Sequence, residues 1–291
     1  MAISNRAKGA LCIMTSAFCF ALMNMFVRLS GDLPSIEKSF FRNAVAAVIA
    51  FVALIKNKES FKWHKGSFPG LLTRAICGTV GILCNFYAID HLVLTDASML
   101  NKLSPFFAVI FSFILLKERV SLFQGLMVVT AFIGSLFIIK PTPGLLNPAS
   151  IVGLCGGLGA GIAYAMVRKL TEMGERKTYI VFFFSIFSCI VTMPYLIFNF
   201  HPMSWLQLIF LICAGASAAG GQFTITAAYS YAPAREISVF DYTQIIFAAA
   251  LGFFVLGQIP DSLSVIGYVI ICSVSLIMFI KNNTERHHNG K

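Results

Sequence analysis

Charged residues are scarce in this chain of 291 residues: only 12% are Asp, Glu, Lys or Arg, whereas 58% are hydrophobic. Soluble domains average about 25% charged residues. The mean hydropathy is +0.82. This composition excludes an ordinary water-soluble globule and favours a chain whose outer surface meets lipid.

The residue types that catalysis needs are missing from the apolar runs. Asp241 is the one carboxylate placed well inside an apolar run, and intramembrane aspartyl proteolysis requires two that share a proton. The five histidines all fall in polar loops or in the C-terminal tail, away from any nucleophile or metal site. The sequence therefore disfavours an enzyme and predicts neither a metal nor a cofactor.

Cysteine and glycine patterns have structural explanations. All eight cysteines lie in apolar runs, which indicates packing residues rather than a disulfide framework or a metal cluster. The glycine-rich segment 153–165 has no preceding strand, so a nucleotide-binding loop is excluded. Gly153, Gly157 and Gly161 recur every four residues and predict close helix packing.

Apolar runs of about 20 residues, long enough to cross a hydrocarbon core of about 30 Å, recur along the whole chain. They predict an all-α polytopic membrane protein with ten transmembrane helices. The first run is too long for a signal-peptide core and is predicted to be retained. The predicted spans are residues 9–28, 35–55, 69–90, 94–116, 121–140, 150–168, 178–198, 204–232, 234–256 and 262–280.

Lysine and arginine are distributed unequally between the two sides of this arrangement. The termini and the loops after the second, fourth, sixth and eighth spans hold sixteen of them, whereas the opposite loops hold two, Arg28 and Lys140. Because juxtamembrane cations are retained in the cytoplasm, both termini are predicted to be cytoplasmic. The net charge of +10 then reflects topology and contact with the lipid bilayer, and the scattered basic residues argue against a nucleic-acid partner.

The chain also contains an internal repeat. Residues 81–118 align with residues 221–258 at a displacement of 140, in one register across a helix, a short loop and a second helix. Each half holds five predicted helices, an odd number, so the halves must be inverted relative to one another. The predicted repeats are residues 1–142 and 143–291. Inverted repeats with a site between them are typical of secondary transporters, whereas a scaffold or receptor would not require them.

Polar residues recur at matching positions of the two repeats. Ser98, Asn101, Lys102 and Pro105 are spaced to share one face of the fourth predicted helix, and an ionisable group inside a span normally faces the bundle interior or a wet cavity. The repeat places these positions opposite Ser238, Asp241, Tyr242 and Ile245. We therefore expect two walls of one central cavity, with Lys102 and Asp241 bracketing it from two levels.

Further polar residues inside the spans complete the predicted site. Interhelical hydrogen bonding is the alternative role for Asn24, Asn85 and Thr226. Arg42 and Arg74 lie nearer the ends of their helices, where snorkelling or contact with lipid phosphate is the alternative explanation for both. Arg74 is not among the predicted substrate-binding residues. The predicted substrate-binding residues are Lys102, Asp241, Asn101, Ser98, Tyr242, Gln222, Thr226, Asn24, Asn85, Tyr164, Arg42 and Gln244.

Three segments carry a resemblance to a known family: LNKLSPFFAVIFSFILLKERVSLFQG, AGIAYAMVRKL and YTQIIFAAALGFFVLGQ. The chain resembles the EamA branch of the drug/metabolite transporter superfamily over nearly its whole length. It departs from the family pattern at Ile245, where the family has a proline, and at Gln258, the counterpart of Glu118.

The resemblance implies a transporter that moves a small organic metabolite, such as an amino acid or its derivative, across a bacterial inner membrane. Lys102, with help from Arg42, suits a carboxylate or phosphate, and Asp241 suits an amine or a proton, so a zwitterion is the first prediction. An anionic metabolite such as a carboxylate, with Asp241 serving only a coupled proton, is the alternative. A homodimer is compatible with this interpretation.

Overall fold

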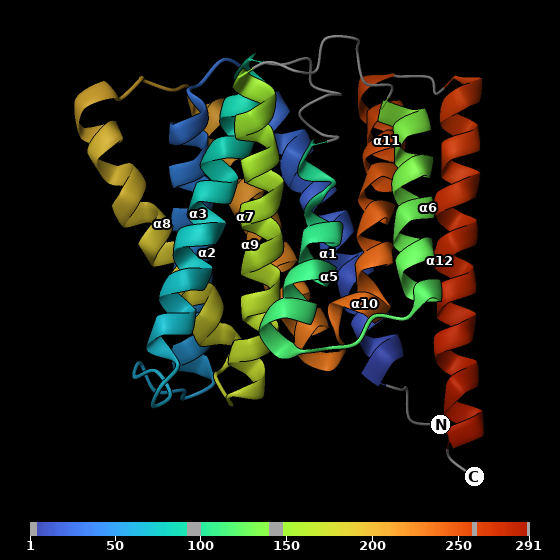
Figure 1. The fold of residues 1–291 in the computed structure, drawn as a ribbon. Coiled ribbons are helices and arrows are strands. Elements are labelled where there is room, and N and C mark those ends of the chain that lie inside the picture. The colour runs from blue at the N-terminus through green and yellow to red at the C-terminus, as the bar shows by residue number, and fades with distance from the viewer. Residues whose placement is uncertain (1–4, 92–99, 140–147, 258–260, 290–291) are drawn as a thin grey trace.

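The computed structural model describes residues 5–91, 100–139, 148–257 and 261–289, which form a bundle of helices (Figure 1). The first half contains α1 (Asn5–Leu29), α2 (Ser35–Lys56), α3 (Phe68–His91), α5 (Ser104–Leu116) and α6 (Leu122–Ile139). The second half contains α7 (Pro148–Glu172), α8 (Lys177–Asn199), α9 (Trp205–Tyr231), α10 (Ala234–Ile237), the 3-10 helix η1 (Ser238–Tyr242), α11 (Thr243–Leu256) and α12 (Ser262–Asn289).

The described residues confirm the all-α membrane architecture. They contain eight spans that are long and apolar enough to cross a bilayer, with α10, η1 and α11 counted as one, and two shorter apolar helices, α5 and α6. The ten predicted transmembrane helices correspond in order to these elements. N and C lie at the same end of the bundle (Figure 1), as an even number of crossings requires.

Helix packing follows the internal repeat. The helix α1 packs against α9 and α11, and its counterpart α7 packs against α3 and α5. The pairs α2 with α8 and α6 with α12 each join one helix to its own counterpart. Exchanging every helix for its counterpart leaves this set of contacts unchanged, as expected of two inverted five-helix repeats related by a pseudo-two-fold axis.

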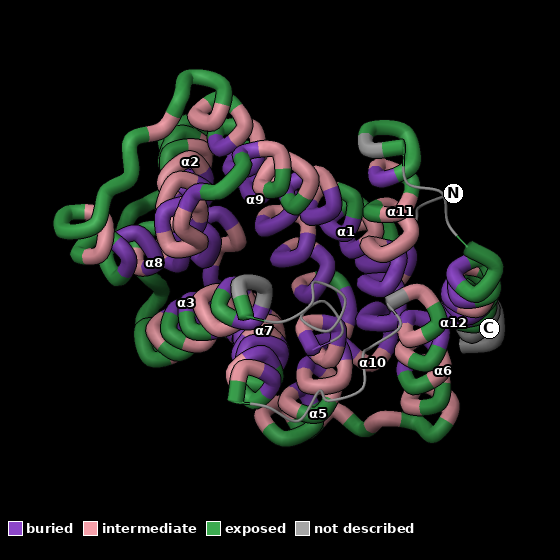
Figure 2. Tube along the Cα trace, turned by 90° about the horizontal axis from the view of Figure 1, so that it is seen from above, coloured by how far each residue is buried: buried purple, intermediate pink, exposed green. Residues whose placement is uncertain are grey.

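Buried residues gather on the sides of the helices that face the bundle, and exposed ones lie on its outside (Figure 2). Large apolar side chains remain exposed on this outer surface, among them Val48 on α2, Ile190 on α8 and Phe254 on α11. In water such a surface would drive aggregation, whereas lipid tails solvate it. The high hydrophobic content of the sequence is therefore explained by the side chains that face lipid.

Small residues let α7 approach its neighbours closely. An ideal Cβ at Gly161 would lie 2.3 Å from the Cβ of Phe107, and one at Gly157 would lie 2.6 Å from the carbonyl oxygen of Leu100. Gly153 likewise faces Leu100 and Ala88. The predicted use of these glycines in close helix packing is confirmed.

The fourth predicted helix is not continuous, which corrects one expectation. Its first residues, 94–99, lie outside the described residues, and a turn at Lys102 and Leu103 separates the helical Leu100 and Asn101 from α5. Pro105 occupies the first turn of α5, where its missing N–H removes no helical hydrogen bond. The break explains how a proline is accommodated inside an apolar span.

The ninth predicted helix is broken at the corresponding place. The short α10 passes into η1 and then into α11, so Asp241 and Tyr242 lie in a 3-10 segment rather than in an α-helix. Because neither helix is regular across its break, the spacing argument that put Ser98 to Pro105 on one helical face does not hold through Lys102. What the two halves share is a helix break that carries an ionisable residue.

Candidate functional site

Lys102 lies at the break of the first half and reaches the second half directly. Its Nζ donates to Gln244 Oε1 at 2.6 Å and lies 3.2 Å from Asp241 Oδ2. It also lies 3.4 Å from the backbone carbonyl oxygen of Asp241. Both charged side chains are nine-tenths buried, so the pair is shielded from water and from lipid headgroups.

The direct ion pair corrects the expectation that Lys102 and Asp241 would bracket a cavity from two levels. Both residues sit where a helix is interrupted, and the interruption brings the two chain segments together in the bundle interior. Tyr242, which is fully buried, strengthens the junction by donating its hydroxyl to the backbone oxygen of Lys102 at 3.0 Å. The junction brings together four predicted site residues: Lys102, Asp241, Tyr242 and Gln244.

A second polar group lies around Tyr164 of α7. The Tyr164 ring stacks on Tyr229 of α9, with centroids 5.3 Å apart and an interplanar angle of 18°. Asp241, Arg74 and Arg42 are all close enough for their charges to act on the Tyr164 hydroxyl. Tyr164 therefore lies within electrostatic range of the ion-pair junction and of both arginines.

Arg74 is the residue that the sequence interpretation missed. It is only 2% exposed, so the snorkelling interpretation was wrong. Its Nη2 donates to Gln222 Oε1 at 2.9 Å, and its guanidinium lies 4.1 Å from the Phe184 ring centroid. The glycine one turn further along α3, Gly78, was the sequence signal that could have indicated a buried Arg74. A side chain at Gly78 would occupy the space of the guanidinium.

The remaining predicted residues differ in their environment. Arg42 is buried on α2 and donates from Nε to Met23 Sδ at 3.0 Å. Thr226 is fully buried, whereas Asn85 and Asn101 are partly exposed. Ser98 lies outside the described residues. None of these observations tests whether a residue binds substrate, so the site assignment stays a prediction.

Asn24 of α1 is more exposed than the residues that precede it on the same face of the helix. It lies on the same face of α1 as Phe20 and Ala17, four and seven residues earlier, and those two are buried. Asn24 itself is exposed. Along this face of α1, burial therefore ends before Asn24.

Ion pairs join the two halves at the end of the bundle that holds the termini. Arg168, near the end of α7, contacts Glu118 in the α5–α6 loop at 3.4 Å and also contacts Glu172 at 2.9 Å. Arg6 of α1 pairs with the buried Glu236 of α10 at 2.9 Å. These contacts close the bundle at that end.

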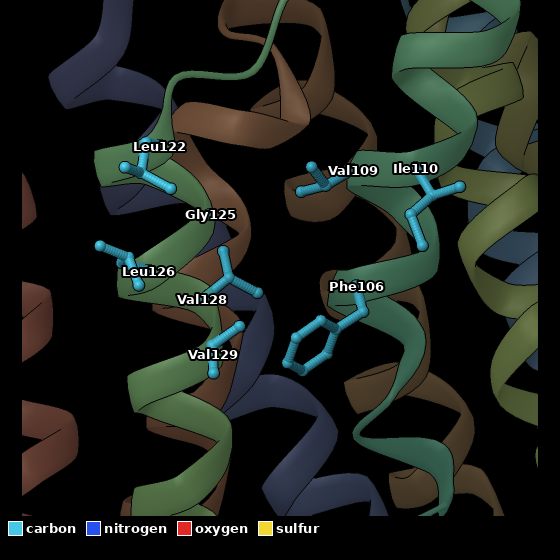
Figure 3. Close-up of a pocket in the computed structure, with 8 residues that line it drawn as sticks. All are labelled: Phe106, Val109, Ile110, Leu122, Gly125, Leu126, Val128 and Val129. Atoms are coloured by element: carbon cyan, nitrogen blue, oxygen red, sulfur yellow. The ribbon is translucent and has the colours of Figure 1, made fainter.

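An apolar groove of about 340 Å³ lies between α5 and α6 (Figure 3). None of the predicted site residues lines it. Several lining side chains, including Ile110, Leu122 and Leu126, are exposed on the outside of the bundle. The groove therefore belongs to the lipid-facing surface and not to the polar interior.

Inverted five-helix halves, two interrupted helices and an ion pair that joins them at the interruptions define a class of protein, the membrane transporter built from inverted repeats. The model of the EamA-like transporter family matches this chain twice, over residues 7–140 and 147–280. The chain belongs to this family.

Individual relatives agree with the family. The chain is 31% identical to the pseudopaline exporter CntI of Pseudomonas aeruginosa, over 90% of this chain and 93% of that protein. It is 27% identical to a riboflavin transporter of Vibrio cholerae, over 93% and 92%. A solved crystal structure with 12% identity superposes with a TM-score of 0.82 over 94% of this chain and 98% of that one, which shows the fold. The family and these two relatives are transporters, which points away from enzyme activity.

Proposed function

We propose that the protein is a secondary transporter that moves a small organic metabolite with an acidic group across a bacterial inner membrane by alternating access. The observation that carries the proposal is the Lys102–Asp241 ion pair, which joins the two inverted halves at both helix breaks. In transporters of this architecture, interrupted helices at a repeat interface surround the substrate and coupling-ion sites.

The ion pair gives the halves a contact that substrate or protons can change. Removing one partner from a buried pair is costly, so the two halves stay joined while both charges are present. A proton on Asp241, or an anionic group next to Lys102, weakens the attraction between them. We propose Asp241 as the site of a coupled proton on this basis.

We propose that the bundle is in an outward-facing state. The excess of cations at the termini and their adjacent loops predicts that this end is cytoplasmic, and the Arg168–Glu118 and Arg6–Glu236 pairs close it. Asn24 is exposed toward the opposite end. In the proposed cycle, the cytoplasmic ion pairs separate as the halves rock and the outer end closes.

The paired state of Asp241 favours the anionic substrate class over the zwitterionic one. The zwitterion hypothesis needs Asp241 to hold an amine while Lys102 holds an acid group. In the structure these two charges satisfy one another, which leaves no unpaired carboxylate for an amine among the described interior residues. The buried cations Arg42 and Arg74 remain for an acid group.

Transport can be tested before the substrate is identified. Cells that express the protein or its Lys102→Met variant should differ in the acidic metabolites that mass spectrometry detects in the medium and in the cell extract. Candidates from that comparison should then be taken up by proteoliposomes, with a rate that depends on an imposed pH gradient. Lys65→Met, which removes an exposed loop lysine, is the matched control. Identical metabolite profiles for cells with the unaltered protein and cells with Lys102→Met would refute the proposal.

A further inference from the structure

Away from the helix ends, the described residues of the bundle interior carry more positive than negative charge. The other buried carboxylates, Glu37, Glu175 and Glu236, lie at helix ends or in a loop and contact His201, Arg176 and Arg6. Lys102, Arg42 and Arg74 are each at least nine-tenths buried on membrane helices or at their breaks. Asp241 is the buried carboxylate beside them, and it pairs with Lys102. Among the described residues, the interior therefore keeps two guanidinium charges without a carboxylate partner.

The hydrogen bonds of the two arginines indicate that their donors are underused. Each guanidinium has five N–H groups. The contacts of Arg42 include a weak acceptor, the thioether of Met23, and those of Arg74 include the neutral amide oxygen of Gln222. The buried Nε of Arg74 has no hydrogen-bond partner. Isolated charges in a membrane interior are costly, so a partner of opposite charge is expected from outside the chain.

Arg74 is also held in place by its neighbours. The Phe184 ring lies against the guanidinium at 4.1 Å, a cation–π contact that fixes its plane. A Cβ at Gly78 would come within 2.2 Å of Arg74 Nη1 and within 2.8 Å of Phe184. The absence of a side chain at Gly78 thus creates the space that the guanidinium fills. A fixed guanidinium presents its donors in a defined geometry.

Arg42 and Arg74 are close enough for their charges to influence one another and the hydroxyl of Tyr164. Two neighbouring guanidiniums repel one another, whereas an oxyanion bound between them attracts both. Guanidiniums suit carboxylate and phosphate because parallel N–H groups bind two oxygens at once.

We propose that Arg42 and Arg74 form an anion subsite that binds the carboxylate, phosphate or sulfonate group of the transported metabolite, separate from the Lys102–Asp241 pair. The subsite rests on the proposed function, since it names the part of the substrate that the transporter holds. Tyr164 lies within electrostatic range of both centres, so a metabolite whose acid group binds the arginines can extend toward Asp241.

Thermal unfolding of the purified full-length protein in detergent tests the subsite. The probes are inorganic phosphate, succinate and citrate, compared with choline chloride at equal ionic strength and with glucose. At least one of the three anions should raise the unfolding temperature of the unaltered protein in a saturable way. Arg42→Gln and Arg74→Gln should raise the half-saturating concentration roughly tenfold to a hundredfold, as expected for loss of hydrogen bonds to a charged group.

Two further variants separate binding from folding. Gly78→Ala keeps both charges but displaces Arg74, so it should weaken anion binding. Arg74→Lys keeps the charge without the planar fork and should bind with intermediate affinity. Arg119→Gln, which removes an exposed loop cation, is the control and should leave the anion-induced rise in unfolding temperature unchanged.

The outcomes separate the subsite from the transport proposal. The subsite is wrong if none of the anions stabilises the unaltered protein beyond choline chloride, or if the Arg42 and Arg74 variants keep its half-saturating concentration. Lys102-dependent transport of an acidic metabolite that Arg42→Gln and Arg74→Gln leave unchanged would overturn the subsite alone. Anion binding that depends on both arginines, with no transport of any metabolite, would support the subsite and overturn the proposed function.

Discussion

Replacing Lys102 with methionine should destabilise the protein because it leaves Asp241 buried without its cation. The side chains are close in length, so packing is preserved while the charge is lost. The Nζ to Oδ2 distance is 3.2 Å, at which two unit charges attract by about 5 kcal/mol with an effective dielectric constant of about 20. Removing one partner of a buried pair costs about 3–5 kcal/mol in measured cases.

The double variant Lys102→Met/Asp241→Asn distinguishes an unpaired charge from poor packing. It removes both charges, so its stability should lie within about 1 kcal/mol of the unaltered protein, although transport should be lost. Asp241→Asn alone leaves Lys102 unpaired and should be destabilised as well. The non-additivity of the two single variants measures the coupling between the residues.

The assay is thermal unfolding of the purified protein in detergent, with transport measured in proteoliposomes for the same four proteins. For soluble domains of 150–250 residues, 1 kcal/mol shifts the unfolding temperature by about 2–4 °C, so each single variant should unfold roughly 6–20 °C lower. Single variants as stable as the unaltered protein would show that the two charges are not a buried pair. If the destabilisations of the two single variants simply added up in the double variant, the buried ion pair would likewise be refuted.

Three further predictions concern topology, packing and pH. In a background without the native cysteines, a cysteine at His201 should react with an impermeant maleimide in intact cells and one at Lys62 should not; the reverse pattern would overturn the orientation. Gly161→Ala should lower the unfolding temperature because its ideal Cβ meets α5 at 2.3 Å, whereas Gly125→Ala, with nothing within 4 Å, should not; equal effects would contradict the packing argument. Burial raises the pKa of Glu118 above its ordinary 4.5, so the folded state binds its proton more readily and stability should fall as pH rises through that range. As pH rises through this range, the unfolding temperature of Glu118→Gln should fall less than that of the unaltered protein. An identical pH dependence of the two unfolding temperatures would refute the raised pKa of Glu118.

The positions of the membrane helices could be predicted from the sequence to within a few residues. The predicted span 35–55 corresponds to α2 at Ser35–Lys56, and the predicted span 178–198 to α8 at Lys177–Asn199. Insertion into lipid depends on the summed hydropathy of consecutive residues, which is a local property. The breaks at Lys102 and Asp241 were missed, because hydropathy averaged over about 20 residues stays high across a short polar interruption.

The sequence by itself determined the class of fold, because the number of apolar runs and the displacement of 140 residues between similar segments require two inverted halves. It also supplied most of the candidate site, because polar residues inside apolar spans are few. Only the tertiary structure decided how these residues are paired. Lys102 and Asp241 are 139 residues apart in the chain, and the burial of Arg74 depends on space at Gly78 and on a ring from α8. Such contacts depend on how the two halves meet, which no local pattern of residues encodes.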